Sequence, residues 1–429
     1  MKIFIHTLGC KVNQYETQAM ETLLAERGHT ISPTGEDCDV CVVNTCAVTA
    51  ESGRKSRQAI RRLRDINPNA VIAVCGCYSQ ISPEETASLG VDLIGGSANR
   101  RAFVEQLETA AARRQGAVEL DEALRRRDFE PLPAGKMPGR TRAMLKIEDG
   151  CDNFCSYCII PYARGPVRSL PPDAVIAEAS RLDAEGFREI VVTGIEIASY
   201  GKDLKTGVGL GDIVADICAA APNARIRLGS LEPRIITEDF CRTLASAGNV
   251  CPHFHLSLQS GCDETLRRMR RKYDTARFYE SVLLLRDHFP DCALTADLIV
   301  GFPGETDEEF ASTLAFIEKC AFSQMHIFPY SRRPGTAADR LEDQLDRREK
   351  QSRARRASEI AGKMKDGFLQ GCVGTVQSVL FEQEKDGLFI GHAGNYCEVM
   401  IKGENLKNCM VNVQITGVKD GVLLGNAIL

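Results

Sequence analysis

Three cysteines in the middle of the chain are close enough in sequence to hold one metal centre. They are Cys151, Cys155 and Cys158, with the spacing C-x3-C-x2-C. Three thiolates can hold three irons of a 4Fe-4S cluster, which leaves the fourth iron without a protein ligand. An open metal position can bind a small molecule and act on it. Structural zinc usually takes four ligands, and no fourth Cys or His lies nearby in the sequence.

A second set of three cysteines lies near the N-terminus, widely separated in sequence. Cys10, Cys46 and Cys77 each fall just after a predicted strand. Because ligands gather beyond the carboxyl ends of parallel strands, we expect these thiols at one edge of a sheet. Their spacing alone is weak support for a shared metal site. Cys75 is the alternative to Cys77 as the third member.

The other cysteines need no special function. The chain has 18 cysteines, and its first residues show no basic leader followed by an apolar run. We therefore expect a cytoplasmic protein with reduced thiols, and no stretch approaches the roughly 18 apolar residues of a membrane span. Buried free cysteine packs as a small hydrophobic residue. This reading applies, for example, to Cys38, Cys41, Cys218, Cys241, Cys292 and Cys320.

The elements that position the N-terminal thiols alternate between strands and helices. Strands are predicted at residues 2–6, 40–43, 71–74 and 91–94, and helices at 13–27 and 52–64. This order predicts an α/β fold with a doubly wound parallel sheet. Residues 105–140 are predicted to form a helix and then a linker at 130–139.

A second alternating series surrounds the central cysteines. Strands are predicted at residues 143–147, 189–193, 226–230, 253–257, 293–300 and 325–329. Helices are predicted between them at 172–184, 210–221, 276–287 and 307–321, with a further charged helix at 346–365. Six βα units form a parallel barrel, complete or partial.

The last part of the chain has a different pattern. Glycine-punctuated strands are predicted at residues 375–381, 387–390, 397–401, 410–418 and 422–427. They indicate a small antiparallel β domain, expected to be a five-stranded barrel.

The central motif resembles the signature of the radical SAM superfamily, with Tyr157 at the usual aromatic position before the last cysteine. The resemblance implies that Cys151, Cys155 and Cys158 hold a 4Fe-4S cluster whose open iron binds S-adenosylmethionine. Reductive cleavage of the sulfonium would then give a 5′-deoxyadenosyl radical.

Both cysteine sets together resemble the methylthiotransferase family. Its members have a flavodoxin-like N-terminal domain with a second 4Fe-4S cluster, a radical SAM barrel and a C-terminal β domain like the TRAM RNA-binding module. The resemblance implies Cys10, Cys46 and Cys77 as the second ligand set. It also implies domains at residues 1–112, 137–367 and 368–429.

Short strings around the cysteines separate the branches of this family. TLGCKVNQYET, NTCAVTAESGRKSRQ and CIIPYARGPVRS resemble the branch that acts on N6-threonylcarbamoyladenosine. The isopentenyladenosine branch typically reads GCQMN at the first cysteine, and the branch that modifies a ribosomal-protein aspartate reads GCPKN. The implied reaction is 2-methylthiolation of N6-threonylcarbamoyladenosine at position 37 of tRNA. Implied partners are the tRNA anticodon stem-loop, a flavodoxin- or ferredoxin-type electron donor and a sulfur donor.

Residues at the predicted ends of the barrel strands are candidates for the S-adenosylmethionine site, together with Tyr157. Gly194 removes side-chain bulk where the methionine end would approach, and Glu196 is a candidate to orient its ammonium group. Each position is also consistent with an ordinary turn. The further candidates are Ser230, Glu232, Gln259 and Gly301.

Several arginines are candidates for contacts with tRNA phosphates. Arg164 and Arg168 follow the central cysteines, and another set recurs at helical spacing. That set is Arg54, Arg57, Arg61 and Arg64. An exposed arginine-rich helix face is an equally weighted alternative, and for the run 267–272 (RRMRRK) a solvated helix face is the favoured interpretation. Residues 361–429 contain six Lys and seven Asp or Glu, so the last domain carries no positive surplus.

Two other functions fit the same residues. The chain is alternatively a methylthiotransferase for isopentenyladenosine or for a ribosomal-protein aspartate. It is also readable as a non-enzymatic iron–sulfur or zinc RNA-binding adaptor.

Overall fold

The computed structural model describes residues 1–113, 117–133 and 141–428. It begins with a six-stranded, all-parallel sheet in the order β2-β1-β3-β4-β5-β6. The strands are β1 (Lys2–Thr7), β2 (Thr30–Ile31), β3 (Val40–Thr45), β4 (Val71–Gly76), β5 (Leu93–Gly95) and β6 (Ala117–Glu119). The predicted doubly wound sheet is confirmed.

Helices cover both faces of this sheet. They are α1 (Lys11–Glu26), α2 (Ala50–Ile66), α3 (Cys77–Ile81), α4 (Pro83–Ala87) and α5 (Arg100–Arg113). Alternate residues of β3 explain the two layers, since Val40 and Val42 share one core with α1 and α5. Cys41 and Val43 pack instead with Ile60 of α2.

Strand β6 was not predicted, because its three residues are too short to show a hydrophobic period. It is followed by the short 3-10 turn η1 (Ala123–Arg125). Residues 134–139 of the predicted linker (130–139) lie outside the described residues, as does residue 137, the expected start of the second domain.

The central region is a partial (β/α)6 barrel, as predicted. Its strands are β7 (Arg142–Lys146), β10 (Glu189–Thr193), β11 (Arg225–Leu228), β12 (Ser230–Leu231), β13 (His253–Gln259), β14 (Ala293–Val300) and β15 (Gln324–Pro329). They form two parallel sheets, β11-β10-β7 and β12-β13-β14-β15, and the chain passes from one to the other at Gly229. No pairing between β7 and β15 closes the barrel within the described residues.

Long helices cover the outside of the barrel, and short elements form its carboxyl-end loops. The helices are α7 (Pro172–Ala184), α8 (Leu210–Ala220), α9 (Glu238–Ala247), α11 (Thr275–His288), α12 (Asp307–Cys320) and α13 (Arg347–Gly371). The short elements are β8 (Glu148–Asp149), α6 (Ile160–Arg164), β9 (Arg168–Ser169) and α10 (Asp263–Arg268).

The inside of the barrel is polar because polar and apolar residues alternate along β13. Phe254, Leu256 and Leu258 are fully buried toward the helices. His253 and His255 lie on the opposite face, toward the lumen.

The C-terminal region is a closed barrel in the order β16-β17-β18-β20-β19. Its strands are β16 (Val376–Lys385), β17 (Leu388–Ala393), β18 (Glu398–Lys402), β19 (Met410–Lys419) and β20 (Val422–Ala427). Five strands were predicted as an antiparallel barrel, and four of the pairings are antiparallel. The pair β18–β20 is parallel, because β19 lies between these two strands in sequence but on the far side of β20 in space.

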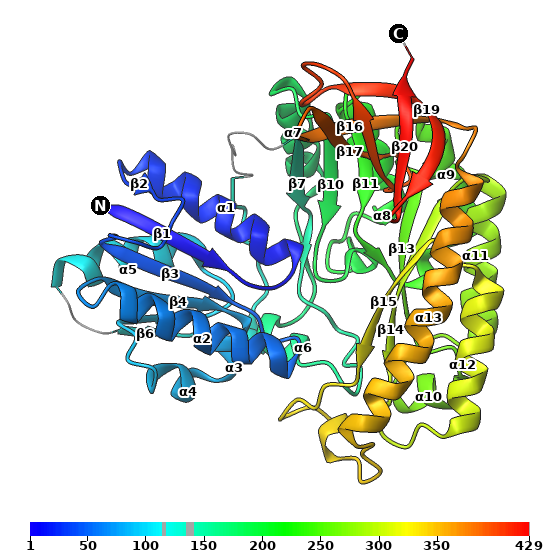
Figure 1. Cartoon of the computed structure of the whole chain (residues 1–429). Helices are drawn as coiled ribbons and strands as arrows, with labels where there is room; N and C mark the ends of the chain where they lie inside the picture. The colour runs from blue at the N-terminus through cyan, green and yellow to red at the C-terminus, as the bar shows by residue number, and fades with distance from the viewer. Residues whose placement is uncertain (114–116, 134–140, 429) are drawn as a thin grey trace.

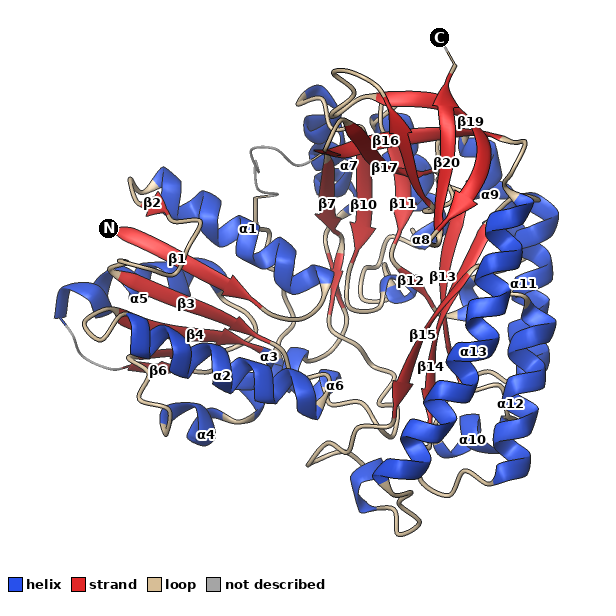
Figure 2. Ribbon diagram, in the orientation of Figure 1, coloured by secondary structure: helices blue, strands red, loops and turns tan. Residues whose placement is uncertain are grey.

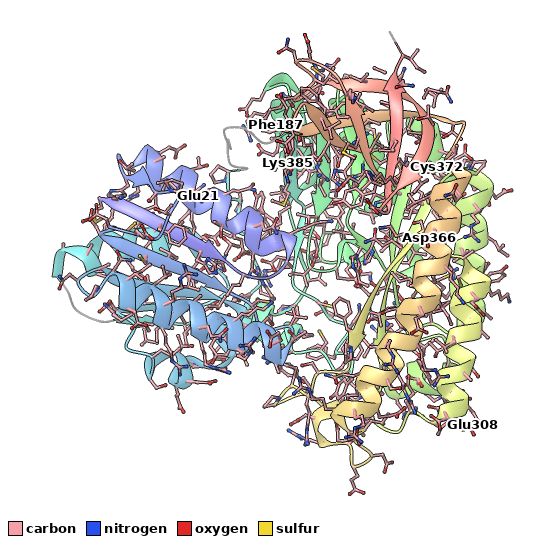
Figure 3. All side chains as sticks on the ribbon, in the orientation of Figure 1. Glu21, Phe187, Glu308, Asp366, Cys372 and Lys385 are labelled. Carbon is pink, nitrogen blue, oxygen red and sulfur yellow. The ribbon has the colours of Figure 1, made fainter. Side chains whose placement is uncertain are left out.

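The carboxyl ends of the N-terminal sheet point at the central unit, whose own strands run crosswise to that sheet, and α6 lies at the junction (Figure 1). Strands β1, β3 and β4 run toward the central barrel, and the C-terminal barrel sits at the opposite, amino end of β7, β10 and β11 (Figure 2). Cys372, at the end of α13, marks where that helix meets the C-terminal barrel (Figure 3). No helix among residues 1–113, 117–133 and 141–428 is long and apolar enough to cross a membrane.

Candidate functional site

The central cysteine loop lies between β8 and α6, at the carboxyl end of the barrel. Burial raises the pKa of the Cys151 thiol, and Glu196 and the other two thiols raise it further. Burial also raises the pKa of Cys158 to about 12, with Cys155 as the next cause. The three thiols are therefore close neighbours. A guanidinium nitrogen of Arg271 lies 3.2 Å from Cys155 Sγ and supplies positive charge beside the thiols.

The N-terminal thiols also meet, at the edge where the two units face each other. Cys10 is the N-cap of α1, Cys46 follows β3 directly, and Cys77 begins α3. Burial raises the pKa of each thiol, and each is an electrostatic neighbour of another member of the set. Arg164 opposes this rise at all three thiols and so favours the thiolate form that a cluster needs.

The structure distinguishes Cys77 from Cys75. Gly76, with φ +108°, lets the chain turn from β4 into α3, and a side chain there would collide with the backbone of Thr45. Cys77 then faces Ala47 and Ile159 at the junction of the two units. Cys75 points into the hydrophobic core of the sheet and is fully buried.

A buried ion network joins the two cysteine sites. Arg164 of α6 donates to Cys77 Sγ over 3.3 Å, to Asn13 Oδ1 over 2.8 Å, and to the Glu16 carboxylate. Glu16 is also paired with Arg100 and Lys146, and these cations outweigh burial and hold its pKa well below the usual range. The network has four cations and two carboxylates, and the surplus positive charge suits a cluster with anionic thiolates. Its charged members are Glu16, Arg100, Lys146, Asp149, Arg164 and Arg168.

Three predicted S-adenosylmethionine contacts lie next to the central thiols. Tyr157 packs edge-on against Phe302, with ring centroids 6.4 Å apart. Glu196 lies 3.4 Å from Asn153 Nδ2, within the cysteine loop. Burial raises the pKa of Glu196 to about 7, with Arg271 opposing and Glu232 adding. A Cβ on Gly194 would lie 2.7 Å from the Glu148 carboxylate, so the close approach here is to a protein side chain.

The other predicted contacts lie at successive strand ends. Ser230 pairs in register with His255 and therefore faces the lumen. Glu232 is buried and accepts from Arg234 over 3.0 Å. Gln259 has φ +64° at a register shift of β13. The backbone N–H of Gly301 donates to Glu305, and a side chain at this position would collide with Lys350 of α13. Close packing against α13 therefore explains why a glycine is found here.

Two predictions about basic residues near the cysteines are wrong. Arg164 and Arg168 are buried at 0% and 3% exposure in the ion network, so they do not face tRNA phosphates. The run 267–272 is not a solvated face throughout, because Arg271 donates to Cys155 and Lys272 to Asn153 Oδ1 over 3.1 Å. Sequence periodicity shows which residues share a face, but not what packs against that face.

The predicted basic stripe on α2 is largely neutralised. Arg54 pairs with Glu51, Arg57 with Glu85, and Arg64 with Asp92. Arg61 is exposed and has no ion-pair partner among the described residues.

Some site residues were not predicted. Glu148 of β8 is fully buried, and its carboxylate accepts the backbone N–H of Glu196 over 2.7 Å. In the lumen, His255 Nε2 lies 3.2 Å from Asp297 Oδ2, and His326 stands beside this pair. The alternation of His, Ser and Gln along HFHLSLQ is the sequence signal that could have revealed a polar lumen.

A radical SAM enzyme is the class that this barrel and its cysteine loop define. Residues 145–317 match the model of the Radical SAM superfamily, and residues 2–96 match that of an uncharacterized family, UPF0004.

Curated relatives extend over nearly the whole chain. The threonylcarbamoyladenosine tRNA methylthiotransferase of Bacillus subtilis is 38% identical over 96% of this chain and 93% of its own length. That of Thermotoga maritima is 36% identical over 94% and 91%. The tRNA-2-methylthio-N(6)-dimethylallyladenosine synthase of Symbiobacterium thermophilum is 34% identical over 100% and 94%. The chain belongs to the radical SAM methylthiotransferase family.

Among solved structures, the radical S-adenosylmethionine methyltransferase TsrM of Kitasatospora setae has a similar fold. Its TM-score is 0.57 at 15% identity, over 90% of this chain and 79% of that one. As a family member, the present chain uses S-adenosylmethionine and two 4Fe-4S clusters. The two sets of three thiols, each beside an arginine, fit these groups.

Proposed function

We propose that this protein converts N6-threonylcarbamoyladenosine at position 37 of tRNA to its 2-methylthio derivative. The observation that carries the proposal is the meeting of two thiol sets at the junction of two parallel units. Full-length relatives named as threonylcarbamoyladenosine tRNA methylthiotransferases support the same substrate. The isopentenyladenosine, ribosomal-protein and non-enzymatic alternatives have less support.

The proposal assigns the six cysteines as cluster ligands. Cys151, Cys155 and Cys158 hold the cluster that binds S-adenosylmethionine, and Cys10, Cys46 and Cys77 hold the second cluster. When bound, these groups supply a 5′-deoxyadenosyl radical, a site for sulfur and a methyl donor. This chemistry is needed because adenine C2–H offers neither acidity nor a nucleophilic handle.

The chain's own residues then bind and orient the reactants. Arg271 and Arg164 stabilise the thiolates of the two sets. Glu196, Glu232 and Tyr157 are proposed to position S-adenosylmethionine at the mouth of the lumen. Gly194, Ser230, Gln259 and Gly301 shape the surrounding strand ends.

The remaining assignments follow from this function. We propose three domains, residues 1–112, 137–367 and 368–429, with family matches at 2–96 and 145–317 in support. The external partners are the tRNA anticodon stem-loop, a low-potential flavodoxin- or ferredoxin-type electron donor and a sulfur donor. We propose a cytoplasmic location, because tRNA is modified there.

Mass spectrometry of bulk tRNA from a strain that lacks the gene tests the substrate. We expect loss of the 2-methylthio form of N6-threonylcarbamoyladenosine and its return on complementation. Complementation with a Cys151→Ala variant should fail. Intact levels in the deletion strain, or loss of the isopentenyladenosine derivative instead, would overturn the assignment.

A further inference from the structure

A solvent-exposed lysine without a partner lies at the amino end of the central barrel. Lys11 follows Cys10 and begins α1. Among the described residues, no carboxylate or hydrogen-bond acceptor pairs with its ammonium group. Its electrostatic neighbours are Arg142, Arg227, Glu189 and Tyr396, at the amino ends of the barrel strands and in the loop between β17 and β18.

Lys11, Arg142 and Tyr396 are among the residues that line a cavity of about 370 Å³. Lys11 and Gln14 come from α1, Arg142 and Met144 from β7, and Tyr396 from the C-terminal barrel. The C-terminal barrel therefore supplies part of the lumen wall, although it lies at the end opposite the cysteine loop.

The charge around this cavity has a positive surplus. Glu189 is paired with Arg225 and Arg227, and Glu382 is paired with Arg142 over 2.7 Å. With Lys11, four cations thus face two carboxylates. A further anion fits this environment, whereas an apolar group gains no attraction from the surplus positive charge.

Tyr396 provides a rigid polar group beside Lys11. Its ring lies under the guanidinium groups of Arg227 and Arg142, at 4.7 Å and 5.5 Å, and stacks on His253 at 4.9 Å. The ring is thus fixed from several sides. Its hydroxyl has no hydrogen-bond partner among the described residues and is free to donate to a ligand.

We propose that Lys11 and Tyr396, with Arg142, bind the threonine carboxylate of the substrate nucleoside. This inference rests on the proposed function and deepens it. Lys11 is the residue next to Cys10, so an adenine whose C2 reaches the N-terminal thiols has its N6 substituent within reach of this lysine. The site selects an anionic substituent and rejects the apolar isopentenyl group.

Three anticodon stem-loops that differ only at nucleotide 37 test the proposal with the reconstituted enzyme. They carry N6-threonylcarbamoyladenosine, its carboxamide analogue, and isopentenyladenosine. We expect kcat/KM for methylthiolation to fall about 10-fold from the carboxylate to the carboxamide, the loss typical of a hydrogen bond to a charged group. Equal rates for carboxylate and carboxamide would overturn the carboxylate site. Modification of isopentenyladenosine alone would instead overturn the proposed function.

Variants test which residues of the cavity cause the preference for the carboxylate. In Lys11→Met, kcat/KM for the carboxylate substrate should fall by the same factor. The ratio of kcat/KM between carboxylate and carboxamide should then be less than about 3-fold. Tyr396→Phe, in the C-terminal barrel, should lower kcat/KM about 10-fold, as for one hydrogen bond to a charged group. Lys319→Met, on the outer helix α12, is the matched control and should behave as wild type. Iron content and tRNA-independent 5′-deoxyadenosine formation should be unchanged, and retained discrimination in Lys11→Met would contradict the proposal.

Discussion

Cys75 and Cys77 differ by two positions, and the structure gives them opposite surroundings. Cys77 lies beside Arg164 at the junction, whereas Cys75 is packed among apolar residues of the sheet. We predict that Cys77→Ala lowers iron from about eight to about four per chain, because one cluster loses a ligand. Cys75→Ala is the matched control and should keep its iron. Iron analysis after anaerobic reconstitution decides which of the two cysteines is the ligand. A halved iron content in Cys75→Ala would reverse the assignment.

Burial favours the neutral form of the Glu148 carboxyl group. Burial raises its pKa well above the usual 4.5, and Asp149 and Glu196 add to the shift. The unfolded chain releases this proton near pH 4.5 but the folded chain holds it. Stability is therefore lost as the pH rises above 4.5, by about 1.4 kcal/mol per pH unit for this group.

Glu148→Gln should remove this penalty, because a neutral amide replaces a neutral acid of the same shape. We predict that the unfolding free energy of the cluster-free variant falls less between pH 5 and 7 than that of wild type. Urea unfolding at both pH values measures the difference. Parallel pH dependences for the two proteins would show that Glu148 is ionised.

At the scale of elements, α6 connects the two thiol sites through Arg164. This arginine bonds to α1 through Asn13 and Glu16, and to α3 through Cys77. We predict that Arg164→Gln destabilises the chain by about 3–5 kcal/mol, because Glu16 and Asp149 lose a buried counter-charge. Urea unfolding measures this loss. Arg61→Gln, on the exposed face of α2, should change stability by less than about 0.5 kcal/mol, and a similarly small effect for Arg164 would contradict the role of the network.

The sequence predicts strands and helices well where the hydrophobic pattern extends over many residues. The strand predicted at residues 293–300 coincides with β14, and the helix predicted at 172–184 coincides with α7. The central cysteine set could be predicted from its C-x3-C-x2-C spacing, and the N-terminal set because strand ends in parallel sheets converge. The parallel pairing of β18 with β20, and β6 at the sheet edge, depend on long-range contacts that no local pattern encodes.

Tertiary contacts also decide the role of single charges. Arg164 and Arg168 read as surface cations in sequence, yet they are buried against partners from α1, α3 and β8. Lys11 and Tyr396 come from opposite ends of the chain, so only the folded structure shows them at one cavity.

At the scale of the whole molecule, the two ends of the central barrel are expected to differ in tRNA binding. Arg347 and Arg348 are exposed at the start of α13, at the cysteine end, and pair with no carboxylate within the described part of the chain. We predict that reversing both charges to Glu weakens tRNA binding and lowers the salt dependence by about one ion per lost phosphate contact. Titrations at several salt concentrations measure both effects.

The matched control lies on the C-terminal barrel. Reversing Lys402 and Lys407, which are exposed at the opposite end, should change tRNA affinity less than the α13 variant does. A larger loss from the barrel variant would mean that tRNA is bound mainly by the C-terminal barrel.

The central claim is that this chain activates adenine C2 of a threonylcarbamoylated tRNA. The most direct test is one turnover with an anticodon stem-loop that carries deuterium at C2 of N6-threonylcarbamoyladenosine. We expect deuterium in 5′-deoxyadenosine and a 2-methylthio product that has lost it. Product formation with unlabelled 5′-deoxyadenosine, or deuterium retained at C2, would contradict hydrogen abstraction from adenine C2.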